Sequence, residues 1–290
     1  MYSQIDSNKR KTNALIVIFL SLIIGIGVIM NQFFGYGYEV VVGAAIFSLV
    51  MTWFSYYHSD KIALHSTGAT EIKKEDNPYV YRMVENLCIT QGVPMPRVHI
   101  IESPALNAFA TGRDPEHASI AFTTGIIQAL ENEELEGVIA HELSHIKNYD
   151  IRLMTVVIVL VGTVSLLADF FFRARLFGSG GNRKSNGGSG ILMLIGLALL
   201  ILSPIISELI KLAISRKREF LADASGVLLT RYPEGLARAL EKIERSPQSF
   251  DRAGAATAHL FISEPLKRKA AGMFSTHPPV AERIAKLRSM

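Results

Sequence analysis

The sequence is poor in cysteine and in charged residues, and both shortages narrow the class of protein. Its single cysteine, Cys88, excludes an internal disulfide framework, fits a reducing compartment and cannot build a zinc site on its own. Charged residues make up only 19% of the 290 residues, whereas hydrophobic residues make up 49%. With a mean hydropathy of +0.27, this composition is too apolar for an ordinary soluble domain and predicts membrane spans together with one modest soluble domain.

We attribute the positive charge of the chain to interaction with the membrane rather than with nucleic acid. The net charge is +4 and the pI is about 9.1, but the sequence carries no signature of RNA or DNA binding. Lys and Arg residues instead lie next to apolar runs, where the positive-inside tendency places them on the cytosolic side. We therefore expect the lipid bilayer as a partner, and no nucleic acid.

Two apolar runs near the N-terminus predict a pair of membrane spans. The polar segment 1–13 carries the basic triplet Lys9–Lys11 shortly before the run 14–30, and no convincing small-residue cleavage site is present. We therefore expect an uncleaved anchor whose N-terminal segment lies in the cytosol. The second run, 40–54, is followed by aromatic residues that suit the membrane interface. Residues 14–57 are thus predicted to form two transmembrane helices.

Two further apolar runs follow in the second half of the chain. We expect a third membrane segment in residues 151–172 and a fourth in residues 191–211, separated by a flexible Gly/Ser-rich linker over 173–190. An even number of crossings leaves the two soluble parts, 58–150 and 212–290, on one side of the membrane, even if these runs form a hairpin that does not fully cross. The basic linker is in tension with this topology, which places it outside.

The first soluble part mixes helices with short strands. Asn77 and Pro78 predict the start of a helix that runs to Gln91. Arg97–Ile101 and Ser119–Phe122 are typical of strands, and a further helix begins at Thr123 and leads into the next one. That order of elements is common among zinc peptidases but is weak evidence alone.

The pentapeptide His141-Glu142-Leu143-Ser144-His145 carries the chemistry. On an α-helix, positions i and i+4 share a face, so His141 and His145 can present two imidazoles to one metal ion. Glu142 lies about 100° round the helix from His141, within reach of a metal-bound water without being a ligand. Zn²⁺ lowers the pKa of such a water, and a glutamate takes its proton as the water attacks a carbonyl.

The residues around this motif favour a helix. Asn132 is predicted to cap it, Glu133 and Glu134 suit its first turn, and an apolar stripe runs along it. We expect this helix to continue straight, or nearly so, into the third apolar run. The alternative is a surface helix with two ordinary hydrogen-bonded histidines.

A tetrahedral catalytic zinc requires a third protein ligand, because two histidines and a water leave one position open. The candidates are Glu219, Asp223, His259 and His277. Glu219 and Asp223 are four residues apart on a predicted helix, so Glu219 would be the ligand and Asp223 would orient a ligand histidine. The alternative is that both acids only neutralise the basic residues within 211–218. A lone His259 in an Ala-rich stretch is more typical of a packed or surface histidine.

The succession of motifs resembles the HtpX family of bacterial membrane zinc metalloproteases and, more distantly, is similar to the CAAX prenyl proteases. HEXXH is followed by a fourth span, by Glu219-Phe-Leu-Ala-Asp223 and by Ser275-Thr-His277-Pro-Pro279, and the resemblance covers essentially the whole chain. It implies that His141, His145 and Glu219 bind one Zn²⁺ per chain and that Glu142 is the general base.

With the four apolar runs, this resemblance predicts an α-helical membrane protein that carries a mainly α-helical, zincin-like catalytic domain with a small β-sheet. It implies a multi-pass endopeptidase of the bacterial cytoplasmic (inner) membrane whose catalytic domain faces the cytosol. The implied role is quality control under stress, with misfolded or damaged membrane proteins and unfolded polypeptides as substrates. The oligomeric state is not given by the sequence.

Two further features are candidates for substrate handling. His277, ahead of two prolines, would either stabilise the oxyanion that forms during attack or simply cap the helix that follows. Asn107, Ala108 and Phe109 would either lie along an edge strand to which an extended peptide adds, or form an ordinary turn.

Four alternative functions compete with this one. Charged residues flank the HEXXH motif, which argues against a protease that cuts at mid-membrane. A CAAX-type enzyme would usually be longer and have more spans. A non-catalytic membrane chaperone or scaffold with a structural zinc site would not need Glu142. A transporter would need more intramembrane polar groups than these runs offer.

Overall fold

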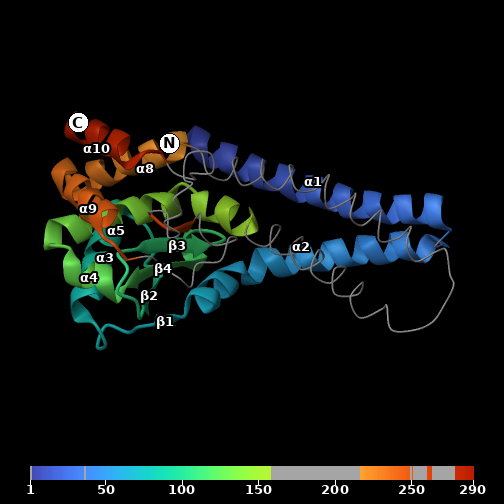
Figure 1. Cartoon of the computed structure of the whole chain (residues 1–290), viewed down its shortest axis with the longest axis horizontal. Coiled ribbons are helices and arrows are strands. Elements are labelled where there is room, and N and C mark those ends of the chain that lie inside the picture. Colours follow the sequence, from blue (N-terminus) through green and yellow to red (C-terminus); the bar gives the residue numbers. More distant parts are fainter. Residues whose placement is uncertain (1, 36, 158–215, 249, 251–259, 263–277) are drawn as a thin grey trace.

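The computed structural model describes residues 2–35, 37–157, 216–248, 250, 260–262 and 278–290. In this part of the chain, two long helices, α1 (Tyr2–Phe34) and α2 (Gly37–Thr67), run side by side away from a body of helices and strands (Figure 1). The start of α1 lies beside that body, so the N-terminal end and the body share one end of the helix pair.

Both long helices have the length and composition of membrane spans. The apolar stretches run over Ile5–Ile29 and Gly37–His58, and only 28% and 6% of them are buried. Side chains so apolar and so exposed fit a lipid environment. Helix α1 is continuous from Tyr2 onward, so the predicted cytosolic segment 1–13, with its basic triplet, belongs to the same helix as the first apolar run. Gly35 and Gly37 have φ of 68° and 55°, a left-handed conformation that lets the chain reverse between the helices.

A small mixed sheet forms one layer of the body. Its strands are β1 (Ala69–Glu71), β2 (Arg97–Ile101), β3 (Ala108–Gly112) and β4 (Ala118–Thr123), in the order β1-β2-β4-β3. Strands β2 and β4 are parallel, and the outer strands pair antiparallel with them. The predicted strands at 97–101 and 119–122 are thus present. Because side chains alternate, Ile120 and Phe122 pack on one face while Phe109 and Ala121 pack on the other.

Helices α3 (Pro78–Gln91), α4 (Thr124–Ala129) and α5 (Asn132–Lys147) follow the strands. Asn77 caps α3 as predicted, its side chain accepting from the N–H of Val80. The predicted cap of α5 is wrong: the N-cap is Glu131, which forms a reciprocal capping box with Glu134. Asn132 is already helical, and its side chain accepts a hydrogen bond from the Tyr79 hydroxyl at 2.6 Å.

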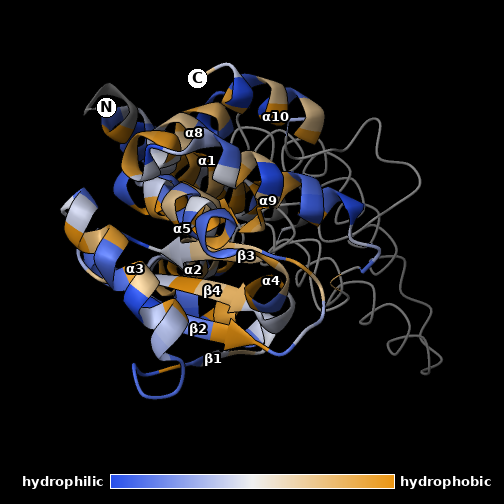
Figure 2. Cartoon of the chain, turned by 90° about the vertical axis from the view of Figure 1, so that its left-hand side faces the viewer, coloured by the Kyte–Doolittle hydropathy of each residue, from blue (hydrophilic) through white to orange (hydrophobic). Residues whose placement is uncertain are grey.

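The C-terminal helices cover the other side of α5. These are α8 (Arg216–Thr230), α9 (Pro233–Arg245) and α10 (Val280–Arg288). Figure 2 shows α5 between the sheet and this layer of helices, with hydrophobic residues on the strands and mixed colouring on the helices. Helix α5 is therefore the centre of the body, and it is buried along nearly its whole length.

Helix α5 does not continue as one helix toward the membrane. Helix α5 ends at Lys147, Tyr149 takes a left-handed φ of 59°, and the chain is helical again from Asp150 to Val157. The prediction that the helix runs straight on, or nearly so, into the third apolar run did not include this break, which is at a non-glycine residue in a conformation that costs about 1–2 kcal/mol. Most of the predicted third segment, the linker and the fourth segment (158–211) lie outside the described residues.

Candidate metal centre

Helices α5 and α8 bring together the three residues that the sequence suggests as metal ligands. One nitrogen or oxygen atom from each of His141, His145 and Glu219 lies within 4.8 Å of the others, and all three side chains are buried. The two histidine Nε2 atoms are 3.1 Å apart. Glu219 lies 3.9 Å from Nε2 of His141 and 3.6 Å from Nε2 of His145. These separations bracket the roughly 3.4 Å expected between ligand atoms about 2.1 Å from a tetrahedral ion.

Each histidine is held through its other ring nitrogen by a carboxylate. Nδ1 of His141 is 2.9 Å from Asp223, and Nδ1 of His145 is 3.0 Å from Asp150. A carboxylate only accepts, so each Nδ1 carries the proton and each Nε2 of a neutral ring keeps its lone pair. When both rings are neutral, the two Nε2 atoms face each other as acceptors, beside the Glu219 carboxylate, and have no proton to share between them. A cation between them resolves this arrangement.

The charges around the site also suit a cation. The buried carboxylates of Glu142, Asp150, Glu219 and Asp223 outnumber the buried guanidinium groups of Arg218 and Arg283 among the described residues. Burial alone disfavours the charged form of His145, but the contact with Asp150 and the charge of Glu219 outweigh it and raise the pKa of His145 to about 9. A divalent metal would supply the missing positive charge, so the residues present fit a metal ion.

Asp150 is a site residue that the sequence analysis missed. On an uninterrupted helix, Asp150 would lie about 140° round from His145, because it is five residues further on. The left-handed Tyr149 breaks the helix between them and lets the Asp150 carboxylate turn back to His145. Nothing in the local sequence marks such a break at a tyrosine.

Arg283 is a second residue that was missed. It comes from α10, is only 1% exposed, and makes a two-point contact with Asp223 through Nε at 2.9 Å and Nη2 at 2.6 Å. Its Nη1 lies 3.7 Å from Glu219. Burial would raise the pKa of Asp223, but the guanidinium of Arg283 outweighs it and lowers that pKa to about 2. Asp223 is thus kept ionised, as its contact with His141 requires.

Glu142 lies beside the candidate metal ligands and is itself 2% exposed. Burial raises the pKa of its carboxyl to about 7, with positive and negative neighbours acting in both directions. Among these neighbours is the backbone N–H of Ala110, which donates to the carboxylate from strand β3. The candidate general base is therefore next to an edge of the sheet.

Strand β3 is at one edge of the sheet, where the sequence analysis suggested an edge strand. Asn107 and Phe109 are nearly inaccessible, with exposures of 2% and 0%, because they face the core. A backbone group from another part of the chain contacts the outer edge of β3: the N–H of Ile262 donates a hydrogen bond to the carbonyl of Ala108 at 3.0 Å. His277, like His259, lies outside the described residues.

Close packing of α8 on α5 depends on Gly226. A Cβ added there would lie 3.1 Å from the backbone nitrogen of His141 and 3.3 Å from the carbonyl carbon of Ala140. Gly226 follows Glu219 by about two helical turns, so the missing side chain lets the whole face with Glu219 and Asp223 approach His141.

This combination of fold and site defines a metallopeptidase: an HEXXH helix, a glutamate from a second helix, and a buried acid next to the first histidine. Comparison with known proteins agrees. A family model described as Peptidase family M48 matches residues 74–290. A protease HtpX homolog from Caldanaerobacter subterraneus subsp. tengcongensis is 46% identical, with 100% of this chain and 98% of the relative covered. One from Tropheryma whipplei is 44% identical with the same coverage.

The protein accordingly belongs to peptidase family M48, among the HtpX protease homologues, and it is a metalloprotease associated with a membrane. The crystal structure of S. mikatae Ste24p shares the fold, with a TM-score of 0.52 at 18% identity, over 99% of this chain and 67% of that one.

Proposed function

We propose that this protein is a zinc endopeptidase of the bacterial inner membrane that hydrolyses misfolded or damaged membrane proteins and unfolded polypeptides at the cytosolic face. The observation that carries the proposal is the convergence of His141, His145 and Glu219 with Glu142 beside them. Each element of a zinc hydrolase site is thus supplied by this chain, and all of it is buried among neighbours that fix its orientation.

The roles of the site residues follow from their contacts. Zinc held by His141, His145 and Glu219 would supply a Lewis acid for the peptide carbonyl and lower the pKa of the attacking water. Glu142 accepts a proton from that water and returns it to the leaving amine, and its burial, which raises the pKa of the carboxyl, favours its holding the proton between the two transfers. Asp223 and Asp150 hold the Nδ1 protons, which keeps both Nε2 lone pairs directed at the metal.

Strand β3 is the proposed place for the substrate main chain. In an antiparallel pair, alternate residues point their backbone groups outward, and here these are Ala108 and Ala110. The Ala108 carbonyl already accepts from Ile262, so the proposed place for the peptide is the edge at Ala110. Ala110 contacts Glu142, so a peptide added along this edge would run past the base. Because the Asn107 and Phe109 side chains are buried, recognition would use the backbone and tolerate many sequences.

The orientation in the membrane is proposed from charge and connectivity. Lys9, Arg10 and Lys11 lie at the end of α1 next to the body, which favours a cytosolic location for both. Helices α5 and α8 pack in the same body, so the chain between them must leave and return on one side. This supports an even number of crossings there, and four spans in total.

The test is proteolysis by the full chain purified in detergent, with casein as an unfolded substrate. We expect cleavage that needs zinc, stops with a chelator and falls about 10²–10⁴-fold in Glu142→Gln, because the variant keeps the metal ligands and lacks the base. Zinc content of the variant, measured in parallel, should match the wild type. Cleavage that persists in Glu142→Gln would refute the assigned base. A folded, zinc-loaded wild type without activity would favour the non-catalytic chaperone or scaffold with a structural zinc site.

A further inference from the structure

Asn8, near the start of α1, is buried in the catalytic body although it belongs to the first membrane helix. Its side chain is 1% exposed. The amide nitrogen donates both of its hydrogens to one place, the break after α5: to the carbonyl of Asn148 at 2.9 Å and to Oδ1 of Asp150 at 2.7 Å. A residue 142 positions away in sequence thus holds the carboxylate that contacts His145.

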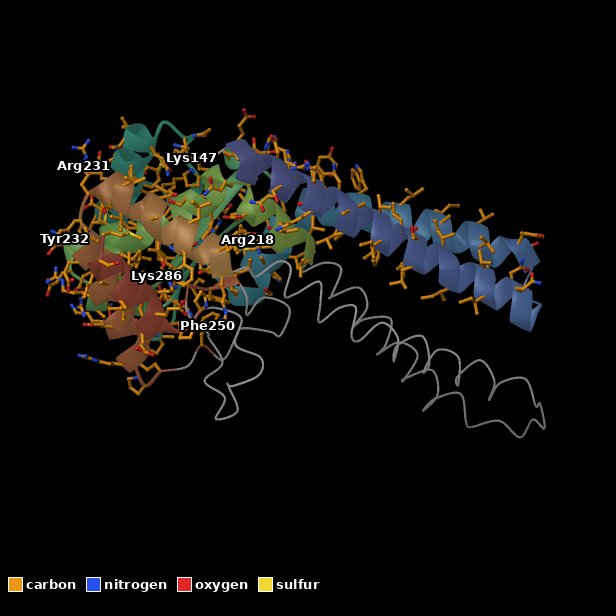
Figure 3. The ribbon with its side chains drawn as sticks, turned by 90° about the horizontal axis from the view of Figure 1, so that it is seen from above. Lys147, Arg218, Arg231, Tyr232, Phe250 and Lys286 are labelled. Carbon is orange, nitrogen blue, oxygen red and sulfur yellow. The ribbon has the colours of Figure 1, made fainter. Side chains whose placement is uncertain are left out.

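The two carboxylate oxygens of Asp150 make different contacts. Oδ1 of Asp150 accepts from Asn8, while Oδ2 lies 3.0 Å from Nδ1 of His145. Fixing one oxygen fixes the plane of the carboxylate and therefore the direction of the other. Arg218 of α8 adds a charge on the same side, with Nη1 3.9 Å from Oδ1, and Figure 3 shows Arg218 on the part of the body nearest the helix pair.

The backbone at Tyr149 is strained, so contacts from another element are needed to stabilise its conformation. Tyr149 is left-handed at φ 59°, and this conformation is what lets Asp150 reach His145. α1 contacts this residue as well: Nζ of Lys9 lies 4.5 Å from the centre of the Tyr149 ring. Strained residues persist where surrounding contacts over-determine them, and here α1 supplies contacts on both Asn148 and Tyr149.

We propose that Asn8 is a positioning residue of the metal centre: it orients the Asp150 carboxylate, which orients the ligand His145. The first turns of α1 are then part of the active site and not only a membrane anchor. The proposal rests on the metal site described under the proposed function. It goes beyond that site by connecting it to a membrane helix.

The experiment measures metal affinity and ligand geometry in the full chain in detergent. Zinc affinity is obtained by competition with a chromophoric chelator, and geometry from the visible spectrum of the Co²⁺-substituted protein. Asn8→Leu keeps the branching and the number of side-chain heavy atoms but has no donor, and we expect it to weaken zinc binding about 10–100-fold and to shift the Co²⁺ bands. Asn13→Leu is the matched control, because Asn13 is an exposed asparagine of the same helix; it should change neither.

A reciprocal exchange covers the case in which Asn8→Leu does not fold. Asn8→Asp sets two carboxylates against each other, and Asp150→Asn sets two amides together. In the double variant, the amide at position 150 donates to the carboxylate at position 8 and turns its oxygen to His145. We expect the double variant to bind zinc more tightly than the product of the two single losses predicts.

The outcomes distinguish the proposed role of Asn8 from the proposed metal site on which it rests. A wild type that binds no metal contradicts the metal site itself. A wild type that binds zinc, with Asn8→Leu showing the same affinity and Co²⁺ spectrum, overturns the role of Asn8 alone. The role of Asn8 is overturned as well if the loss of zinc affinity in the double variant equals the product of the losses in the two single variants.

Discussion

Arg283 and Arg288 lie on the same helix and form ion pairs in opposite environments. Arg283 is buried and holds Asp223 through two nitrogens, one of which is 2.6 Å from its oxygen. Arg288 is exposed and contacts Glu234 at 2.8 Å and Glu241 at 2.9 Å. The two pairs look alike in distance, yet solvent screens only the second, so the buried pair should matter far more for stability.

Substituting each arginine by lysine tests this difference. Lysine keeps the charge but loses the planar fork, so Arg283→Lys leaves Asp223 with a poorer partner in a buried site. We expect a loss of about 2–3 kcal/mol in unfolding free energy and weaker zinc binding. Arg288→Lys on the same helix should change neither measurably. Chemical denaturation and chelator competition of both variants give the answer, and equal effects in the two would contradict the assigned role of Arg283.

Sequence reasoning located those site residues whose relation is local. The four-residue spacings of His141 with His145 and of Glu219 with Asp223 define helix faces, so both pairs could be predicted from spacing alone. Asp150 could not, because it depends on a left-handed tyrosine. Arg283 and Asn8 could not either, since each acts on a residue 60 or more positions away. The misplaced cap at Asn132 has a simpler cause: Glu131 and Glu134 form the capping box one residue earlier.

At the scale of elements, the candidate metal centre forms only because α8 approaches α5 closely. Gly226 allows this, since a Cβ there would meet the backbone of Ala140 and His141. The candidate third ligand, Glu219, and the residue that permits the approach are thus on one helix. Packing of the two helices and formation of the site are then a single event.

Enlarging Gly226 should separate the two helices. Gly226→Leu improves helix propensity, so any loss reports on the contact; we expect a cost of about 1–3 kcal/mol from overpacking and at least a tenfold weaker affinity for zinc. Gly43→Leu is the control, because a Cβ at Gly43 in α2 meets nothing within 4 Å. Thermal melting and zinc competition distinguish them. Wild-type affinity in Gly226→Leu would show that α8 does not need this approach.

The fold itself was predictable to a similar extent. The helix from Asn77 and Pro78, both central strands and the helix of the HEXXH motif follow from caps and periodicity in the sequence. Strand β1 is only three residues long and gave no pattern to detect. The break after α5 escaped prediction because the polar residues 147–150 between α5 and the next apolar run are compatible with a continuous helix, and only tertiary contacts from α1 show what holds the break.

At the scale of the whole molecule, the proposed topology puts the body and the turn between α1 and α2 on opposite sides of the membrane. Met290, at the body, is 59% exposed, and Tyr38, at the turn, is 78% exposed. Cys88 is 3% exposed, and burial raises the pKa of its thiol to about 12, so the natural cysteine should not react. The chain is therefore already suited to site-directed labelling.

Labelling with a membrane-impermeant maleimide should separate the two positions. We expect Met290→Cys to react only in inverted membrane vesicles, in which the cytosolic face is outward, and Tyr38→Cys only in right-side-out cells. The unsubstituted protein serves as the blank. Reaction of both positions from the same side would contradict the crossing of α1 and α2, and the reverse pattern would contradict a cytosolic body.

The central claim is that this chain holds one zinc ion between α5 and α8. The most direct measurement is an anomalous difference map at the zinc absorption edge, from crystals of the zinc-loaded Glu142→Gln protein. We predict one peak, within bonding distance of Nε2 of His141, Nε2 of His145 and the Glu219 carboxylate. A peak elsewhere, or no peak in protein shown to contain zinc, would contradict the account.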